Sequence, residues 1–316
     1  MLRNITLDNV ILGIRALVME ILSVYWTLVK IMVPVLIAVK LLDHLGATQV
    51  IADLFEPIMS LVGLPETMGL VLATAMLTNM YTAMVVFLSF TGTTPLSVAE
   101  VTVLGSMMLL SHSIPIEGTI AKTVGLPWSA TILLRVGGAF LLGFGLHWMY
   151  KITHTMQSPA IIVWHPAPTD DSLSAWAFSQ IETLLGLLLI LVFLMSLLKL
   201  LKQVGAEKWI HWALAPLLRL LGIGKEATNI IVIGAMLGLS FGGGLLIQEA
   251  KRSTISKRDI MLSIAFIGIC HGLIDDTIVM LLLGADITGV LWIRIIFAVL
   301  IMAIIARLPI VKQRLG

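Results

Sequence analysis

The sequence predicts an all-α integral membrane protein made of two inverted-topology repeats with re-entrant or broken helices, an architecture typical of transporters. Three observations lead to this fold class: the composition, an internal match at a constant offset, and the distribution of charge. Of the 316 residues, 59% are hydrophobic and 12% are charged, whereas soluble domains carry about 25% charged residues. There are too few polar residues to cover a surface that faces water, so we expect lipid to be the outer solvent.

Charge and cysteine content exclude several classes of protein. The net charge of +2 gives no basis for binding nucleic acid. The single cysteine, Cys270, excludes an intramolecular disulfide and a cysteine-rich metal site. The first apolar run carries Glu20 and Lys30 and has no small-residue cleavage site, so we expect a retained membrane helix rather than a signal peptide.

An internal repeat relates the two halves of the chain at an offset of 159 residues. Leucine matches alone would arise by chance between apolar segments, but the matches include residues that are rare in such segments. They are Gly46 with Gly205, Pro57 with Pro216, Gly63 with Gly222, His112 with His271, Glu117 with Asp276, Gly125 with Gly284, and Arg135 with Arg294. We therefore predict a first repeat at 1–150, an external linker at 151–178 and a second repeat at 179–316.

Each predicted repeat contains four apolar segments, named A to D in chain order. In the first repeat they cover 17–42, 67–90, 98–124 and 129–150, and in the second 181–201, 227–250, 260–283 and 288–307. A membrane-spanning helix needs about 20 such residues. A shorter stretch follows segment A, and its second copy carries two tryptophans between Lys208 and Arg219, which predicts a helix lying in the membrane interface.

Charge predicts that the two repeats have opposite orientations in the membrane. The connection between segments A and B is acidic in the first repeat and basic in the second, where it holds Lys202, Lys208, Arg219 and Lys225. The positive-inside rule places the first connection outside and the second inside. An odd number of crossings per repeat follows, so one of the four segments does not cross.

Segment B is the favoured non-crossing segment, because basic residues flank it on both sides in the second repeat. On this interpretation segment B is a re-entrant hairpin. The alternative, in which segment B spans and segment C is re-entrant, stays open. Both place the N- and C-termini in the cytoplasm and predict a multi-pass protein of the bacterial inner (cytoplasmic) membrane.

The residues with the most chemistry lie inside segment C. In the first repeat His112 is followed by Glu117 and Thr119, and in the second His271 is followed by Asp275, Asp276 and Thr277. Pro115, Gly118 and Gly272 are suited to interrupt the helices there. Ionisable side chains at membrane depth usually face a cavity, so we expect these seven polar residues to form a substrate- or ion-binding site where the two broken helices meet.

Two chemistries fit this set of histidines and acids. His112, Glu117, His271, Asp275 and Asp276 are suitable ligands for a divalent transition metal such as Zn, Fe, Mn or Ni. The same groups are suited to carry protons, since histidine titrates near neutrality. A third interpretation is that they pair only to hold the broken helices. No cofactor is expected beyond a coupling cation or divalent metal.

Segment B supplies a second set of candidate binding residues. They are Asn79, Tyr81 and Thr82 in the first repeat and Ser240, Gln248 and Glu249 in the second. Amide and hydroxyl groups suit recognition of a polar solute, whereas the glycines nearby also suit tight helix packing. Arg135 and Arg294 fall in the first turns of segment D, where anchoring at the membrane interface is the expected role.

These motifs resemble a known family. One motif consists of Pro57 and Gly63 followed by a segment broken at Asn79-Met-Tyr-Thr-Ala83, and it resembles the nucleoside-recognition, or Gate, domain. Its copy in the second half resembles the same domain. The copy consists of Pro216 and Gly222 followed by Gly-Leu-Ser-Phe-Gly-Gly-Gly-Leu-Leu-Ile-Gln-Glu-Ala250. Gate domains occur in concentrative nucleoside transporters, in bacterial ferrous-iron permeases and in spore maturation proteins A and B. The resemblance implies a transport scaffold with re-entrant elements and fixes no substrate, and the chain lacks the P-loop of the iron permeases.

The expected function is transport of a small polar solute or ion across the membrane, coupled to protons or another cation, at a site near the midplane. The alternatives are a divalent metal cation permease and a non-transporting membrane component in envelope or spore-type maturation. An enzyme is not expected, because no nucleophile motif appears. The expected partners are the lipid bilayer, a small-molecule or ion substrate and further copies of the chain in a homo-oligomer, but not nucleic acid.

Overall fold

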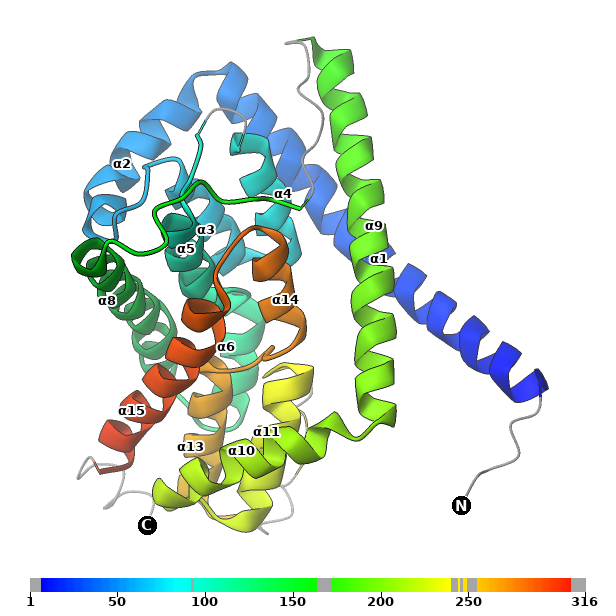
Figure 1. The fold of residues 1–316 in the computed structure, drawn as a ribbon, viewed down its shortest axis with the longest axis vertical. Helices are drawn as coiled ribbons and strands as arrows, with labels where there is room; N and C mark the ends of the chain where they lie inside the picture. The colour runs from blue at the N-terminus through cyan, green and yellow to red at the C-terminus, as the bar shows by residue number, and fades with distance from the viewer. Residues whose placement is uncertain are drawn as a thin grey trace.

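The computed structural model describes residues 7–91, 94–163, 172–239, 244, 247–248 and 255–307. Every regular element within these residues is a helix (Figure 1). Among the described residues, five helical stretches are long and apolar enough to cross a membrane. These findings confirm the prediction of an all-α integral membrane protein.

The first half of the chain contains the helices predicted from its apolar segments. They are α1 (Leu7–His44), α2 (Ala47–Leu61), α3 (Met68–Leu77), α4 (Met80–Phe90), α5 (Val98–Ser111), α6 (Ile114–Thr123), α7 (Trp128–Ile132), the π-helical turn η1 (Leu133–Gly137) and α8 (Gly138–Thr153). Segment B is thus broken into α3 and α4, and segment C into α5 and α6. Segment D is one continuous run from α7 to α8.

The described helices of the second half follow a similar order. They are α9 (Leu173–Gln203), α10 (Ala206–Leu220), α11 (Lys225–Leu237), α13 (Lys257–Ile269), α14 (Asp275–Leu282), the π-helical turn η2 (Thr288–Ile293) and α15 (Arg294–Arg307). Segment C is again broken, here between α13 and α14. Segment D again contains a π-helical turn.

Of the eleven described residues with a positive φ angle, eight form four pairs separated by 159 positions. The pairs are Gly46 and Gly205, Gly63 and Gly222, Gly125 and Gly284, and Ser113 and Gly272. Three of the pairs are glycines, which adopt this conformation without steric cost. The fourth pair lies in the two breaks of segment C, where φ is 54° at Ser113 and 58° at Gly272.

Side-chain caps explain where the broken helices begin. Ser97 forms a capping box with Glu100 at the start of α5, and Ser256 accepts a hydrogen bond from the Asp259 N–H at the start of α13. Asn79 caps α4, since its Oδ1 lies 2.9 Å from the Thr82 N–H that donates to it. The break in segment B is therefore stabilised locally.

The two longest helices, α1 and α9, lie together at one side of the molecule, and the remaining helices form a compact bundle beside them (Figure 1). The Tyr25 hydroxyl of α1 donates to the Leu184 carbonyl of α9 at 3.2 Å. Only 22% of the most apolar window of α1 and 17% of that of α9 are buried. Such apolar exposed surfaces require lipid around them, so the bilayer is a partner of this protein.

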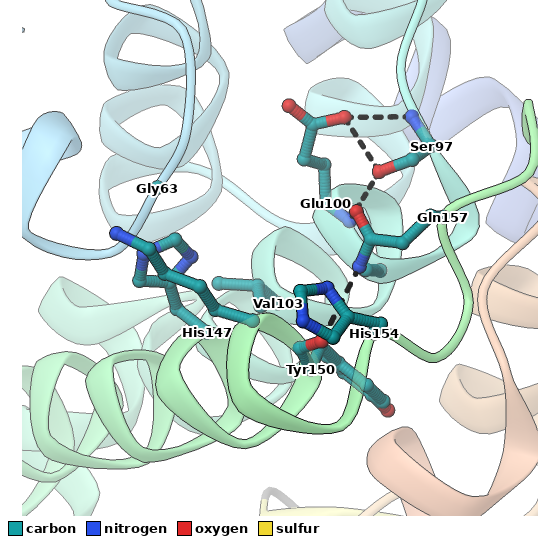
Figure 2. A pocket seen from close by; sticks show the side chains of 10 residues that line it. Gly63, Ser97, Glu100, Val103, His147, Tyr150, His154 and Gln157 are labelled. Atoms are coloured by element: carbon teal, nitrogen blue, oxygen red, sulfur yellow. Dashed lines mark hydrogen bonds between the residues drawn. The ribbon is translucent and has the colours of Figure 1, made fainter.

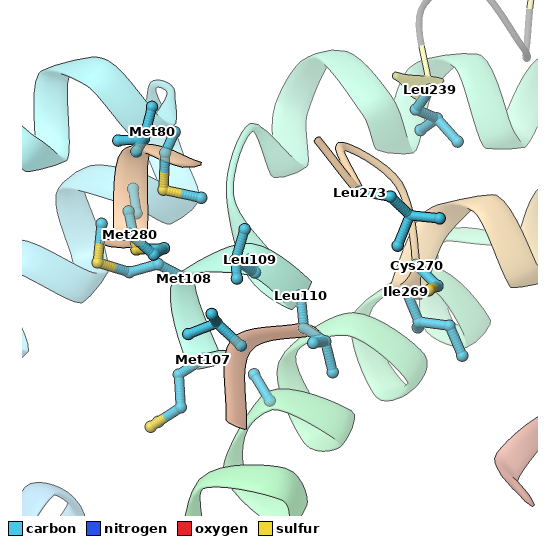
Figure 3. Close-up of a cluster of buried hydrophobic side chains, with 14 of the residues drawn as sticks. Met80, Met107, Met108, Leu109, Leu110, Leu239, Ile269, Cys270, Leu273 and Met280 are labelled. Carbon is cyan, nitrogen blue, oxygen red and sulfur yellow. The ribbon is translucent and has the colours of Figure 1, made fainter. Parts of the chain in front are cut away.

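The core of the bundle surrounds the breaks of segment C. Its buried side chains come from both halves, with Met80, Met107 and Met108 from the first and Cys270 and Met280 from the second (Figure 3). Methionine fills irregular gaps well, which suits a region where helices end inside the core. Both broken helices are therefore enclosed by packed side chains.

The stretch predicted to lie in the membrane interface is a helix in both halves, α2 and α10. In α10 the side chains of Trp209 and Trp212 are 74% and 75% exposed. This exposure suits an interfacial helix, whose depth in the membrane stays a prediction.

Gly63 provides a test of the fold. The replacement Gly63→Ala would place a Cβ atom on the His147 ring and a side chain at a φ of +67°. The left-handed conformation alone costs about 1–2 kcal/mol, so we expect a clear drop in the midpoint of thermal unfolding in detergent. The control Gly145→Ala adds a Cβ atom into open space within α8, so its midpoint should stay level or rise slightly. Equal midpoints for the two variants would contradict the close contact between Gly63 and His147.

Candidate functional site

Two histidines from the two halves meet at the breaks of segment C. His112 follows the last residue of α5, and His271 follows α13 after one residue. Their Nε2 atoms lie 3.1 Å apart, and their ring planes are tilted by 53°. Both side chains are buried, with exposed fractions of 6% and 2%.

The orientation of each imidazole is set by its own helix. His112 Nδ1 lies 3.0 Å from the Met108 carbonyl oxygen, and His271 Nδ1 lies 2.8 Å from the Ile267 carbonyl oxygen. A carbonyl oxygen only accepts, so both Nδ1 atoms carry the proton. In the neutral rings the two Nε2 lone pairs therefore face each other.

Glu117 lies near the start of α6, the helix that follows the break in the first half, and its carboxylate is close to both histidines. Its Oε1 lies 3.2 Å from His271 Nε2 and 3.9 Å from His112 Nε2. Its Oε2 accepts a hydrogen bond from Arg135 Nη1. The remaining donors of Arg135 bind the carbonyls of Leu110 at 2.8 Å and His112 at 2.7 Å. One guanidinium thus satisfies a buried acid and two carbonyls at the end of α5.

The second half has a different arrangement of the equivalent residues. Asp276 Oδ2 lies 3.8 Å from His112 Nε2. Arg294 is fully buried and donates from Nη2 to Thr277 Oγ1 at 3.2 Å. Its Nε and Nη1 atoms, like Asp275 Oδ1, have no hydrogen-bond partner among the described residues. The ion pair of Arg135 and Glu117 therefore has no counterpart between Arg294 and Asp276 in this part of the chain.

The prediction that Arg135 and Arg294 anchor the protein at the membrane interface was wrong. Both are among the largest fully buried side chains of the described part of the chain. The π-helical turns η1 and η2, which contain Arg135 and directly precede Arg294, accompany this inward placement. The sequence did contain a sign that the arginines belong with the histidines and acids, because all of them match at the same offset of 159 residues. Burial next to a broken helix end, which supplies free carbonyls, is visible only in three dimensions.

The other predicted residues divide into three groups. Tyr81 lies within electrostatic range of Asp275 and Asp276, so it borders the cluster. Asn79 and Thr82 form the cap of α4, and Thr119 is exposed and donates to the Pro115 carbonyl, away from the cluster. Gln248 is exposed, and the predictions for Ser240 and Glu249 lie outside the described residues.

The end of the first helix of segment B contacts the break of segment C in both halves. The Ser113 N–H donates to the Ala75 carbonyl at 2.9 Å, and the Ser113 hydroxyl donates to the Thr78 carbonyl at 3.0 Å. In the second half the Leu273 N–H donates to the Ala235 carbonyl at 3.0 Å. These contacts satisfy backbone groups freed by the breaks, and they couple the two broken segments.

Cavities of very different size occur near the cluster and far from it. A cavity lined by Glu117 and Arg135 has a volume of about 10 Å³, enough for about one water molecule. A cavity of about 380 Å³ is lined by Glu100, His147 and neighbouring residues (Figure 2). Glu100 and His112 are separated by most of α5, or about 18 Å of helix. The cavity beside Glu117 and Arg135 is therefore too small for a solute much larger than water.

Comparison with known proteins gives two matches. The model of the family described as nucleoside recognition, named Gate, matches residues 25–127. The chain is also 30% identical over 285 residues to the uncharacterized membrane protein YvoD of Bacillus subtilis, a match that covers 89% of this chain and 90% of that protein. No solved structure matches the chain.

Arg135 provides a test of the cluster. The replacement Arg135→Gln leaves the Glu117 carboxylate buried without its cation, which typically costs about 3–5 kcal/mol. We expect a large loss of stability, measured by unfolding in detergent, and recovery of more than half of it in the double variant Arg135→Gln/Glu117→Gln. The matched control Arg294→Gln should destabilise less, because only one of its donors has a partner among the described residues. A double variant as unstable as the sum of its single variants would show that the two residues do not interact.

Proposed function

Because this chain belongs to the nucleoside-recognition, or Gate, family of membrane proteins, we propose that it transports a small polar solute or ion across the membrane. Transport is coupled to protons or another cation. The coupling site is the cluster of His112, Glu117, His271 and Asp276. The observation that carries this proposal is the convergence of four ionisable side chains from two broken helices inside an apolar bundle.

The energetic cost of this cluster is the reason to assign it a function. Ionisable groups within a membrane-spanning bundle are costly, and they usually mark ion or substrate pathways. The break that carries His112 lies about halfway along the 26-residue apolar stretch Val98–Thr123. A site near the bilayer midplane at broken helices is the arrangement expected of secondary transporters.

An inverted-repeat architecture fits this function. Its support is the set of positive-φ pairs at the predicted offset, the matched breaks in segment C, and the contrasting charges of the two connections between segments A and B. The packing of α3 against α4 supports a re-entrant hairpin in segment B. In this topology the protein lies in the bacterial inner membrane with both termini in the cytoplasm.

The unequal arginines suggest how such a transporter alternates between two states. The first repeat holds its ion pair between Arg135 and Glu117, whereas in the second repeat Arg294 and Asp276 stay apart. Two repeats that exchange conformations would break the first pair and form the second. The cluster would then open to the opposite side of the membrane. Each state would contain one ion pair between an arginine and an acid, so the two states would have similar energies.

Proteoliposomes provide the transport test. Vesicles that contain a pH-sensitive dye and the purified protein are mixed in turn with nucleosides, amino acids, carboxylates and divalent cations. We expect at least one of these solutes to cause a change of internal pH, and the double variant His112→Gln/His271→Gln to lose it. The control His44→Gln alters an exposed histidine and should retain the signal. A folded wild-type protein that changes the internal pH with none of these solutes would exclude their proton-coupled transport.

Topology is tested by cysteine labelling from outside the cell. In a Cys270→Ala background, the single replacements Glu66→Cys and Thr94→Cys lie before α3 and after α4. A re-entrant segment B brings both ends to the same, external side, so a membrane-impermeant maleimide should label both positions in intact cells. Labelling of Glu66→Cys without Thr94→Cys would mean that segment B crosses the membrane.

A further inference from the structure

We propose that the cluster binds one divalent transition-metal ion between His112 Nε2, His271 Nε2 and Glu117 Oε1, with the Asp276 carboxylate next to it. The inference deepens the proposed function and rests on it for the movement of the ion. Binding itself rests only on the geometry of the described residues.

The facing lone pairs require a positive charge between them. Both Nδ1 atoms are committed to backbone carbonyls, so neither neutral ring has a proton to offer at Nε2. Two acceptors nonetheless lie 3.1 Å apart, and a carboxylate oxygen lies 3.2 Å from one of them. Three electron-rich atoms at such distances repel one another unless a cation lies among them.

The number and spacing of the donors favour a metal ion over a proton. In a tetrahedral site with bonds of about 2.0–2.1 Å, ligand atoms lie about 3.2–3.5 Å apart. The ligand atoms of His112, Glu117 and His271 all lie within 4.8 Å of one another, and Asp276 Oδ2 lies 3.8 Å from His112 Nε2. A shared proton would join only two of these atoms, whereas a metal ion binds the ligand atoms of His112, Glu117 and His271 together.

The surroundings of the cluster already hold the ligands in position. Metal-binding histidines usually donate their other N–H to a carbonyl or carboxylate, and both imidazoles do so here. Arg135 fixes the far oxygen of Glu117. At Gly272 a Cβ atom would overlap the Asp276 carboxylate, so the glycine leaves room for that carboxylate beside the imidazoles. Ligands that are ordered before binding lose less entropy on binding.

Charge and ligand type indicate which ions fit. The cluster contains three acids, Glu117, Asp275 and Asp276, and two buried arginines, so one acid has no arginine to pair with and is available to a bound cation. Two imidazoles and carboxylates suit Zn, Fe, Mn or Ni, whereas Mg and Ca prefer sites made of oxygen alone. We therefore expect selectivity for transition metals over Mg²⁺.

The test uses the full chain purified in detergent with an affinity tag that lacks histidine, stripped with a chelator and titrated with ZnCl₂ by calorimetry. We expect one zinc ion per chain and no competition from excess Mg²⁺. His112→Gln and His271→Gln should each weaken zinc binding at least about 10-fold, while His44→Gln should bind as the wild type does. Thermal unfolding without metal identifies variants that do not fold.

Spectroscopy of the wild-type protein keeps the proposal testable if a variant fails to fold. X-ray absorption of the zinc complex should show nitrogen and oxygen ligands at about 2.0–2.1 Å, with scattering from two imidazoles. A folded wild type that binds no zinc, or a double histidine variant that binds it unchanged, would overturn the proposal. Zinc binding without transport in proteoliposomes would overturn the proposed function alone, and transport without zinc binding would overturn this inference alone.

Discussion

The contact between His112 and His271 is the constraint on which the centre of this molecule depends. The two imidazoles meet because the helix before each histidine ends one or two residues earlier. The Nδ1 atom of each ring donates a hydrogen bond to a backbone carbonyl in the last turn of that helix. Helix ends inside an apolar bundle leave carbonyls without partners, which is costly in a membrane. The histidines and Arg135 supply the missing donors, so the same side chains that make the cluster polar also make the broken helices stable.

The difference between the two halves is as informative as their similarity. Arg135 is fully paired with an acid and two carbonyls, whereas Arg294 retains two donors without partners in the described part of the chain. Buried donors without partners are rare because each costs about 1–3 kcal/mol. In the transport cycle that we propose, the unequal pairing of Arg135 and Arg294 is the feature that would distinguish the two conformations.

The cavity beside Glu117 and Arg135 is small compared with a nucleoside in this conformation. About 10 Å³ beside Glu117 and Arg135 leaves no room for a nucleoside-sized molecule, although the family is described by nucleoside recognition. The larger cavity near Glu100 and His147 is separated from the cluster by most of α5. Both observations are compatible with the small cation that we propose for the cluster, and a larger solute would need another place.

The sequence by itself determined the membrane class, the register of 159 residues and the identity of the paired histidines and acids, because composition and matched rare residues need no knowledge of packing. The breaks at Asn79 and His112 were also predictable, since polar and helix-interrupting residues stand out in apolar segments. The tertiary structure decided which of these residues meet. Thr119 and Glu117 are two residues apart, yet one is exposed and the other buried, because successive positions on a helix point in different directions. Only the packing of segment D against the broken segment C of the first half revealed that Arg135 belongs to the cluster, because its partners are two carbonyls and an acid beside that break.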